Sequence, residues 1–252
     1  MLRFASAALL VVAAMVLVAC GSSSSSTTSA STTVSLADCT KDALKTKTAG
    51  TLTVATDKPA YPPYFVDDKP ANGQGFESAV AYAIADKLGY AKGDVKWVVE
   101  PFNSSYAPGP KNFDFDVNQI SITPSRAKRV DFSSPYYEAP QAVVALKGSD
   151  AAKATSLSEL KDTQLGVQIG TTSLDAVNDI IKPTKQAKVF NDSNDVVAAL
   201  KGKQVDAVVV DLPTAFYLTA AQVEDAKIVG QFPVPGGDRW GALLAKGSPL
   251  TA

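Results

Sequence analysis

The sequence predicts an α/β fold of two lobes, each a mainly parallel sheet with flanking helices. Three observations support this. The chain has 252 residues of which 46% are hydrophobic, enough to bury a large core. From Thr51 onward, short β-rich runs alternate with helical patterns, which is typical of α/β architecture. An apolar extended segment at residues 139–147 then leads through a polar linker into a second strand–helix series, which indicates passage into another lobe.

The first lobe begins with the strand TLTVAT at Thr51. The helix ESAVAYAIADKLG follows, because Val80, Ile84 and Leu88 form one apolar stripe and Gly89 is a C-terminal stop. VKWVVE and FDVNQISI are the next expected strands of this lobe.

The second lobe repeats the alternation. QLGVQI, AKVF and VDAVVV are expected strands, and they precede the helices SLDAVNDII, SNDVVAALKGK and LPTAFYLTAA. A return crossing is expected within QFPVPGGDRWGALLAK. The first lobe then comprises residues 35–138 and 240–252, the second comprises residues 139–239 with the hinge strands, and a cleft lies between them.

Residues 1–20 are typical of a bacterial export signal, with Arg3 ahead of a short apolar run. The run ends in LVAC, which resembles a lipobox whose cleavage leaves Cys20 as a lipid-carrying N-terminus. The alternative is an ordinary signal peptide with an incidental cysteine. Residues 21–34 are rich in Ser and Thr and predict a flexible tether. Anchor and tether together predict a domain held outside a membrane.

Composition excludes several classes of function. Lys and Arg number 24 against 25 Asp and Glu, so nucleic acid is not an expected partner. The chain has no histidine, which excludes Ser-His and Cys-His nucleophiles and most transition-metal sites. No metal or cofactor is expected, and an enzyme would have to rely on carboxylates, Lys or Tyr.

The C-terminal sequence raises a separate hypothesis. Ser248 and Pro249 have the pattern of a helix start, yet the chain stops at Ala252. Cys39 is the only cysteine besides Cys20. We expect a truncated chain whose missing tail held the partner of Cys39.

Ligands of open α/β sheets bind at the carboxyl ends of strands. In GTTS, Thr172 is the expected start of a helix with Asp175 three residues on, a spacing like that of a capping box. Its free N–H groups suit a carboxylate, although a capped helix that binds nothing has the same pattern. Arg126 follows a Thr-Pro turn and either grips a carboxylate or is an exposed cation paired with Asp131. Asp211 either binds an ammonium group or caps the next helix.

Together these groups predict a site for a zwitterion. A cation and a helix N-terminus suit a carboxylate, Asp211 suits an ammonium group, and Tyr61 and Phe102 suit the stem between them. Taken singly, Tyr61 and Phe102 are equally consistent with core aromatics. The combination favours an α-amino acid.

The motifs ATDKPAYPPYF, GFESAVAYAIADKLG, FDFDVNQISITPSR, GVQIGTTS and VDAVVVDLPTAFY occur in this order. As a set, from about Leu52 to Leu250, they resemble the family 3 extracellular solute-binding proteins, the polar amino-acid receptors of ABC importers. The resemblance implies the type 2 periplasmic-binding-protein fold with two hinge strands that closes on its ligand.

The resemblance also implies roles for individual residues. It assigns the ligand carboxylate to Arg126 and the backbone N–H of Thr172, the ammonium group to Asp211 and Ser121, the aromatic walls to Tyr61 and Phe102, and side-chain specificity to Asp57 and Gln168. It also implies a ligand contact from the backbone carbonyl of Gln119. Four departures stand out. One extra residue separates Asp57 from Tyr61, Gln119 replaces a common small residue, FNSSYAPGPKNFDFD replaces a Leu-rich helix, and the closing C-terminal helix is absent.

These inferences predict a monomeric, lipid-anchored receptor on the extracytoplasmic face of the cell membrane. It would bind a free amino acid and deliver it to an ABC transporter permease, and its only contact with the membrane itself would be the lipid anchor. One alternative is a dehydratase-like enzyme on the same fold, with Asp57 as the nearest acid or base. The other is the sensing module of a receptor.

Overall fold

The structure is a computed structural model, and it describes residues 39–251. The predicted signal segment, the tether and Cys20 lie outside the described residues. Cys39 is the one cysteine in the described part, and it forms no disulfide there. Among the helices of residues 39–251, none has the length and apolar character needed to cross a membrane.

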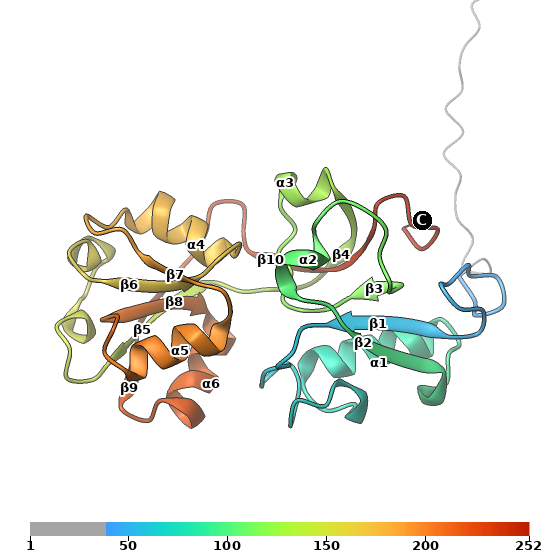
Figure 1. Cartoon of the computed structure of the whole chain (residues 1–252), viewed down its shortest axis with the longest axis horizontal. Helices are drawn as coiled ribbons and strands as arrows, with labels where there is room; N and C mark the ends of the chain where they lie inside the picture. The colour runs from blue at the N-terminus through green and yellow to red at the C-terminus, as the bar shows by residue number, and fades with distance from the viewer. Residues whose placement is uncertain (1–38, 252) are drawn as a thin grey trace, which may run out of the picture. The chain divides into compact units, whose positions relative to one another are not determined.

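The first lobe is built on a five-stranded sheet of order β2-β1-β3-β10-β4 (Figure 1). Its strands are β1 (Leu52–Thr56), β2 (Val95–Val99), β3 (Phe115–Asp116), β4 (Val130–Glu138) and β10 (Arg239–Ala245). The strand β1 pairs in parallel with β2 and β3, whereas β10 pairs antiparallel with β3 and β4. The helix α1 (Phe76–Lys87) packs its small buried residues Ala81 and Ala85 into the same core as Val54 and Trp240.

The second lobe has a sheet of order β7-β6-β8-β5-β9. Its strands are β5 (Gln141–Leu146), β6 (Leu165–Gln168), β7 (Lys188–Phe190), β8 (Ala207–Asp211) and β9 (Ala226–Phe232). Along β5, Val143 packs into one hydrophobic cluster and Val144 into another, because successive side chains of a strand point to opposite faces. Helices cover both faces of this sheet, so side chains on both sides of β5 are buried. This explains the continuous apolar run within residues 139–147. The helices include α4 (Thr172–Ala176), α5 (Ser193–Lys201) and α6 (Leu212–Tyr217).

The two sheets follow one plan. In each, three parallel strands are followed by the strand that enters from the other lobe (β10 or β5), and the strand that leaves (β4 or β9) lies at the edge. The parallel pairing expected from the sequence therefore holds for β1–β3 and for β6–β8. The crossing strands add antiparallel pairs.

The chain crosses between the sheets twice. It leaves β4 after Glu138 and enters β5 at Gln141, and it leaves β9 after Phe232 and enters β10 at Arg239 (Figure 1). The α/β fold of two lobes joined by two crossings is thus confirmed. The second crossing contains Asp238, which is 2% exposed.

The expected strand over FDVNQISI is wrong beyond its first two residues. Only β3 forms, and Gln119 then adopts a left-handed φ of 49°, a conformation that ends an extended run. Glu77 holds this turn, because its carboxyl group accepts hydrogen bonds from the backbone N–H and the side chain of Gln119. Beyond the turn, Ser121 forms an isolated bridge to Trp240.

Short elements complete the fold. The helices α2 (Phe102–Ser105) and α3 (Pro124–Ala127) follow β2 and the Gln119 turn. The helices α4 and α6 continue as π-helical turns over Val177–Ile181 and Leu218–Gln222. Within residues 39–251, four 3-10 turns occur at Pro70–Asn72, Lys92–Asp94, Ala151–Lys153 and Leu157–Leu160.

Candidate functional site

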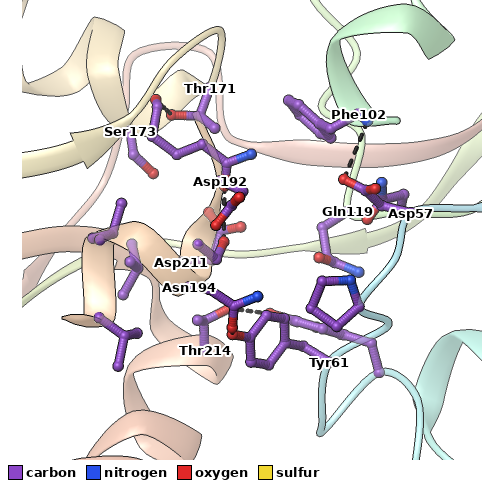
Figure 2. A pocket seen from close by; sticks show the side chains of 18 of the residues that line it. Asp57, Tyr61, Phe102, Gln119, Thr171, Ser173, Asp192, Asn194, Asp211 and Thr214 are labelled. Carbon is purple, nitrogen blue, oxygen red and sulfur yellow. Dashed lines mark hydrogen bonds between the residues drawn. The ribbon is translucent and has the colours of Figure 1, made fainter. Parts of the chain in front are cut away.

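A cavity of about 370 Å³ lies between the lobes and is lined by residues from both (Figure 2). The residues predicted for the site that line it are Asp57, Tyr61, Phe102, Gln119, Ser121, Gln168, Thr172 and Asp211. Arg126 is the predicted residue that does not. The carboxyl ends of the strands therefore meet where the topology predicts.

The innermost polar groups form one connected hydrogen-bond network. Gln141 Nε2 donates to Asp211 Oδ1 at 2.6 Å and to Asp238 Oδ2 at 2.8 Å. Ser173 Oγ donates to Gln141 Oε1 at 2.6 Å, and Thr172 Oγ1 donates to Asp238 Oδ2 at 2.7 Å. Because Gln141 and Asp238 belong to the two crossings, we call this set the hinge network. Ser121 joins it from the first lobe, since its Oγ lies 3.2 Å from Thr172 Oγ1.

The carboxyl group of Asp211 is the electrostatic centre of this network. Burial and the neighbouring carboxylate of Asp238 raise the pKa of Asp211 to about 8. Asp211 occupies the N-cap position of α6, yet its side chain accepts no capping hydrogen bond. The capping alternative is therefore wrong. The side chain lines the cavity, where a cation would stabilise its ionised form.

Arg126 is buried, with 5% of its surface exposed. Its Nη1 donates to the carbonyl of Ser121 and its Nη2 to the carbonyl of Gly170, both at 2.8 Å. The guanidinium carbon lies 4.6 Å from the ring centre of Tyr106 and 5.4 Å from that of Phe102. Arg126 thus does not line the cavity, and two of its guanidinium N–H groups donate to backbone carbonyls.

The alternative interpretation of Arg126 as an exposed cation paired with Asp131 is wrong. Asp131 pairs with Lys246 at 2.7 Å instead. Thr123 caps α3 by accepting a hydrogen bond from the backbone N–H of Arg126 at 3.2 Å, as the Thr-Pro turn predicts. Burial lowers the pKa of Arg126.

The helix at GTTS begins at Thr172, as expected, but its N-cap is the preceding residue, Thr171. Gly170 has a φ of 74°, which ends the strand and leaves Thr171 extended, so Thr171 becomes the N-cap of α4. Its Oγ1 accepts from the backbone N–H of Leu174 at 3.2 Å. The expected cap at Thr172 paired with Asp175 is therefore wrong. The hydroxyl of Thr172 is free to join the hinge network.

A second group of cavity residues is more exposed, and we call Asp57, Tyr61, Asp192 and Asn194 the outer group. Asp57 accepts hydrogen bonds from the backbone N–H groups of Lys58, at 2.7 Å, and Phe102, at 3.2 Å. Burial raises the pKa of Asp57. Tyr61 donates to Asn194 across the cavity (Figure 2).

Two further predicted side chains are engaged in local contacts. Gln168 accepts from Ser193 Oγ at 2.8 Å, within the second lobe. Gln119 donates its side-chain N–H to Glu77, so its amide is directed away from ligand binding by a protein partner. Glu77 is fully buried, and this burial raises its pKa to about 7.

Sequence reasoning missed several residues of the site. Gln141, Asp192, Asn194, Thr214 and Asp238 were not singled out, although Gln141 and Asp238 flank the two predicted crossings. Asn118 was also missed. It lines the cavity, it is 8% exposed, and its Nδ2 has no hydrogen-bond partner among the described residues.

Hydrogen bonds close the lobes over the cavity. Tyr64 Oη and Thr214 Oγ1 are 2.8 Å apart, and Tyr106 Oη donates to the carbonyl of Gly170 at 3.2 Å. The pairs Tyr61–Asn194, Arg126–Gly170 and Ser121–Thr172 likewise join the first lobe to the second. Within residues 39–251, no group of side chains is arranged to hold a metal ion.

Comparisons with known proteins agree with this architecture. Residues 52–204 match the family described as bacterial extracellular solute-binding proteins, family 3. A probable histidine-binding protein of Campylobacter jejuni is 32% identical over 170 residues, which cover 66% of this chain and 61% of that protein. This chain therefore spans less than two thirds of the length of that relative.

Solved structures show the same fold. An ancestral arginine-binding protein bound to glutamine has a TM-score of 0.65 and 36% identity, with 79% of this chain and 86% of that chain covered. An ancestral amino acid-binding protein described as a precursor of cyclohexadienyl dehydratase has a TM-score of 0.63 and 31% identity, with 80% of this chain and 84% of that chain covered.

Proposed function

The chain belongs to family 3 of the bacterial extracellular solute-binding proteins, and from this premise we propose that it binds a free α-amino acid between its two lobes. The observation that carries the proposal is the state of Asp211. Its carboxyl group lines the cavity, is partly shielded from solvent, and has a pKa raised to about 8 by desolvation and the neighbouring Asp238. A ligand ammonium group would restore the ionised form by supplying the missing positive charge.

The ammonium group is proposed to lie against Asp211 and the hydroxyl of Ser121. Gln141 holds the Asp211 carboxyl from one side with a 2.6 Å hydrogen bond, which leaves acceptor capacity on the cavity side. Burying a charged amine is tolerable only where it is fully paired, and Asp211 and Ser121 are partners of the required kind.

The carboxylate is proposed to bind at Thr172 and Arg126. Thr172 begins α4, where backbone N–H groups are unpaired and the helix dipole favours an anion. Arg126 would reach the carboxylate by releasing the carbonyl of Gly170, which belongs to the other lobe. Opening of the lobes separates these two groups, so an incoming carboxylate competes with Gly170 for the same donors on closure.

The aromatic side chains Tyr61 and Phe102 line the cavity from the first lobe. They are proposed to cover the apolar stem of the ligand. Phe102 is held in place by an edge-on contact with Tyr106, at 5.6 Å between ring centres, and Tyr61 by a similar contact with Tyr217 at 6.3 Å.

We further propose that the chain is a monomeric receptor on the extracytoplasmic face of the membrane and delivers its ligand to an ABC importer. The family description as extracellular solute-binding proteins supports this location. The LVAC sequence ending at Cys20 supports attachment through a lipid, and the Ser/Thr-rich residues that follow would be the tether.

The test is isothermal titration calorimetry of the chain against the natural amino acids and against blocked forms of the best ligand. We expect at least one amino acid to bind at micromolar concentration. Its N-acetyl and carboxamide derivatives should each bind about 100-fold more weakly, since each removes one charge that a buried partner holds. Equal binding of a blocked form would contradict the zwitterion site, and binding of no amino acid would contradict the proposed function.

The dehydratase alternative is tested on the same sample. Asp57 is the cavity carboxyl group best placed for acid–base work, with a pKa raised by burial. We expect the bound amino acid to be recovered unchanged after prolonged incubation. Its conversion by loss of water or carbon dioxide would favour an enzyme.

A further inference from the structure

Two carboxylates, one from each lobe, line the outer part of the cavity. They are not among the residues proposed to bind the α-ammonium and α-carboxylate groups of the ligand. Asp57 follows β1 in the first lobe, and Asp192 is the N-cap of α5 in the second (Figure 2). Resting on the proposed function, we propose that the ligand carries a cationic side chain, a guanidinium or ammonium group, seated between Asp57 and Asp192.

The charges that line the cavity favour a second cation. The lining residues with ionisable acidic or basic groups, apart from tyrosines, are Asp57, Asp192, Asp211 and Lys58. Lys58 is exposed and forms no ion pair within residues 39–251. The α-ammonium group of an amino acid would neutralise only Asp211. A neutral side chain would therefore leave Asp57 and Asp192 lining the same cavity with only the exposed Lys58 as a cation, which is unfavourable.

The two carboxylates retain acceptor capacity for a ligand. Asp192 uses Oδ1 to accept from the backbone N–H of Asp195 at 3.0 Å, and its Oδ2 has no partner among the described residues. Asp57 accepts only backbone N–H groups, from Lys58 and Phe102. Besides burial, the negative charge of Asp192 raises the pKa of Asp57, so the two carboxylates repel each other across the lobes. A cation between them would remove this repulsion when the lobes close.

An independent observation shows that the cavity is built for a polar ligand. Asn118 lines it, is 92% shielded from solvent on the basis of its 8% exposure, and has an amide Nδ2 without a partner in the described part of the chain. An unpaired buried amide N–H carries a free-energy penalty, which is removed when it donates a hydrogen bond to an acceptor on a ligand. The carboxylate pair therefore lies in a space that already requires a polar occupant.

The test compares ligands that differ only in side-chain charge. Calorimetry would measure arginine against citrulline, its neutral counterpart of nearly equal shape, and lysine against Nε-acetyl-lysine. We expect the better of the two cationic ligands to bind about 100-fold more tightly than its neutral counterpart. Both ligands of a pair carry the same zwitterion, so the comparison isolates the outer carboxylates.

The variants Asp57→Asn and Asp192→Asn assign the effect to these two residues. Asn remains a good N-cap, so Asp192→Asn removes the charge while preserving the start of α5. Each substitution should reduce the ratio of cationic to neutral affinity about tenfold, with little change for the neutral ligand. The double variant should lose the preference. Asp195→Asn is the matched control, because Asp195 is exposed on the same helix and does not line the cavity.

The outcomes separate this inference from the proposed function. If a neutral amino acid binds as tightly as arginine or lysine to the unmodified chain, the inference is overturned and amino-acid binding stands. If the preference for a cation survives in the double variant, the assignment to Asp57 and Asp192 is overturned. Binding of no amino acid at all would overturn both.

Discussion

The hinge network and the outer group lie in one cavity but are built differently. In the hinge network, Gln141 contacts Asp211, Asp238 and Ser173 at once, and Thr172 links Asp238 to Ser121. Its members come from both crossings and both lobes. In the outer group, Asp57 bonds only to nearby backbone, and Tyr61 and Asn194 form a single contact.

This difference suits the two regions to different parts of the ligand. A connected, buried network couples its members, so changing one residue leaves polar groups unpaired in several others. Such a network suits the part of a ligand that all α-amino acids share. The outer residues have few mutual bonds and more solvent, so a substitution there alters one contact at a time. That part of the cavity is suited to setting which side chain is bound.

The largest effect should come from Arg126→Ala. This change removes the donors that the ligand carboxylate is proposed to use. It leaves the carbonyl of Ser121 without its partner and the carbonyl of Gly170 with Tyr106 alone. We expect amino-acid binding to weaken by about 2–5 kcal/mol for every ligand, whatever its side chain. Calorimetry with the best ligand and with a second amino acid measures this.

Lys128→Ala is the matched control, since Lys128 is an exposed cation two residues further along the same segment. It should bind normally. Thermal unfolding of both variants shows whether the lobes remain folded. If a folded Arg126→Ala variant binds within a few-fold of the parent, Arg126 serves only to hold the two lobes together.

The same contrast explains what could be predicted from the sequence. Strand–helix alternation was sufficient to predict the two lobes. The residues after each strand, together with the family resemblance, predicted eight of the residues that line the cavity. Asp238 and Gln141 escaped because their roles depend on where the two crossings meet, a tertiary arrangement that no local pattern records. Asp192 is the N-cap of α5, and that local role does not mark it as a residue of the cavity.

Other errors had local causes. The long strand expected before Ser121 was interrupted because Glu77, distant in sequence, holds Gln119 in a left-handed turn. The cap of α4 was placed at Thr172 because two threonines stand side by side. Only the φ of Gly170 decides between them. Arg126 was expected to bind the ligand carboxylate, but in the structure it donates to the carbonyl of Ser121 in its own lobe and to that of Gly170 in the other.

A smaller effect is expected from pH, and it should be confined to the hinge network. In the ligand-free protein the pKa of Asp211 is about 8, with Asp238, Glu77 and Arg126 as its charged neighbours. An ammonium ligand favours the ionised form. Binding near pH 6.5 should therefore release about one proton, and affinity should rise up to about tenfold per pH unit towards pH 8. Titrations in buffers of different ionisation enthalpy measure the released proton.

The stability of the ligand-free protein should show the opposite trend. Asp211 and Glu77 have folded-state pKa values of about 8 and 7, above their ordinary values of 3.8 and 4.5. Their contribution to stability is present below the ordinary pKa values and is lost as the pH rises through 7 to 8.

Asp211→Asn is the control for the binding prediction, and it should abolish the proton release on binding. Persistent release in that variant would assign the proton to another group.

The smallest effect should come from Tyr61→Phe in the outer group. The change removes one hydroxyl that bonds to Asn194, at a partly exposed position where water can satisfy both groups. We expect a loss of about 0.5 kcal/mol or less in ligand affinity. Tyr64→Phe is the matched comparison, because it removes an analogous hydroxyl contact between the lobes, to Thr214 at 2.8 Å, from a side chain that is 2% exposed. There the abandoned Thr214 hydroxyl has less access to water, so the loss should approach about 1.5 kcal/mol. If Tyr61→Phe costs as much as Tyr64→Phe, the outer group is as tightly coupled as the interior, and the contrast between the two regions fails.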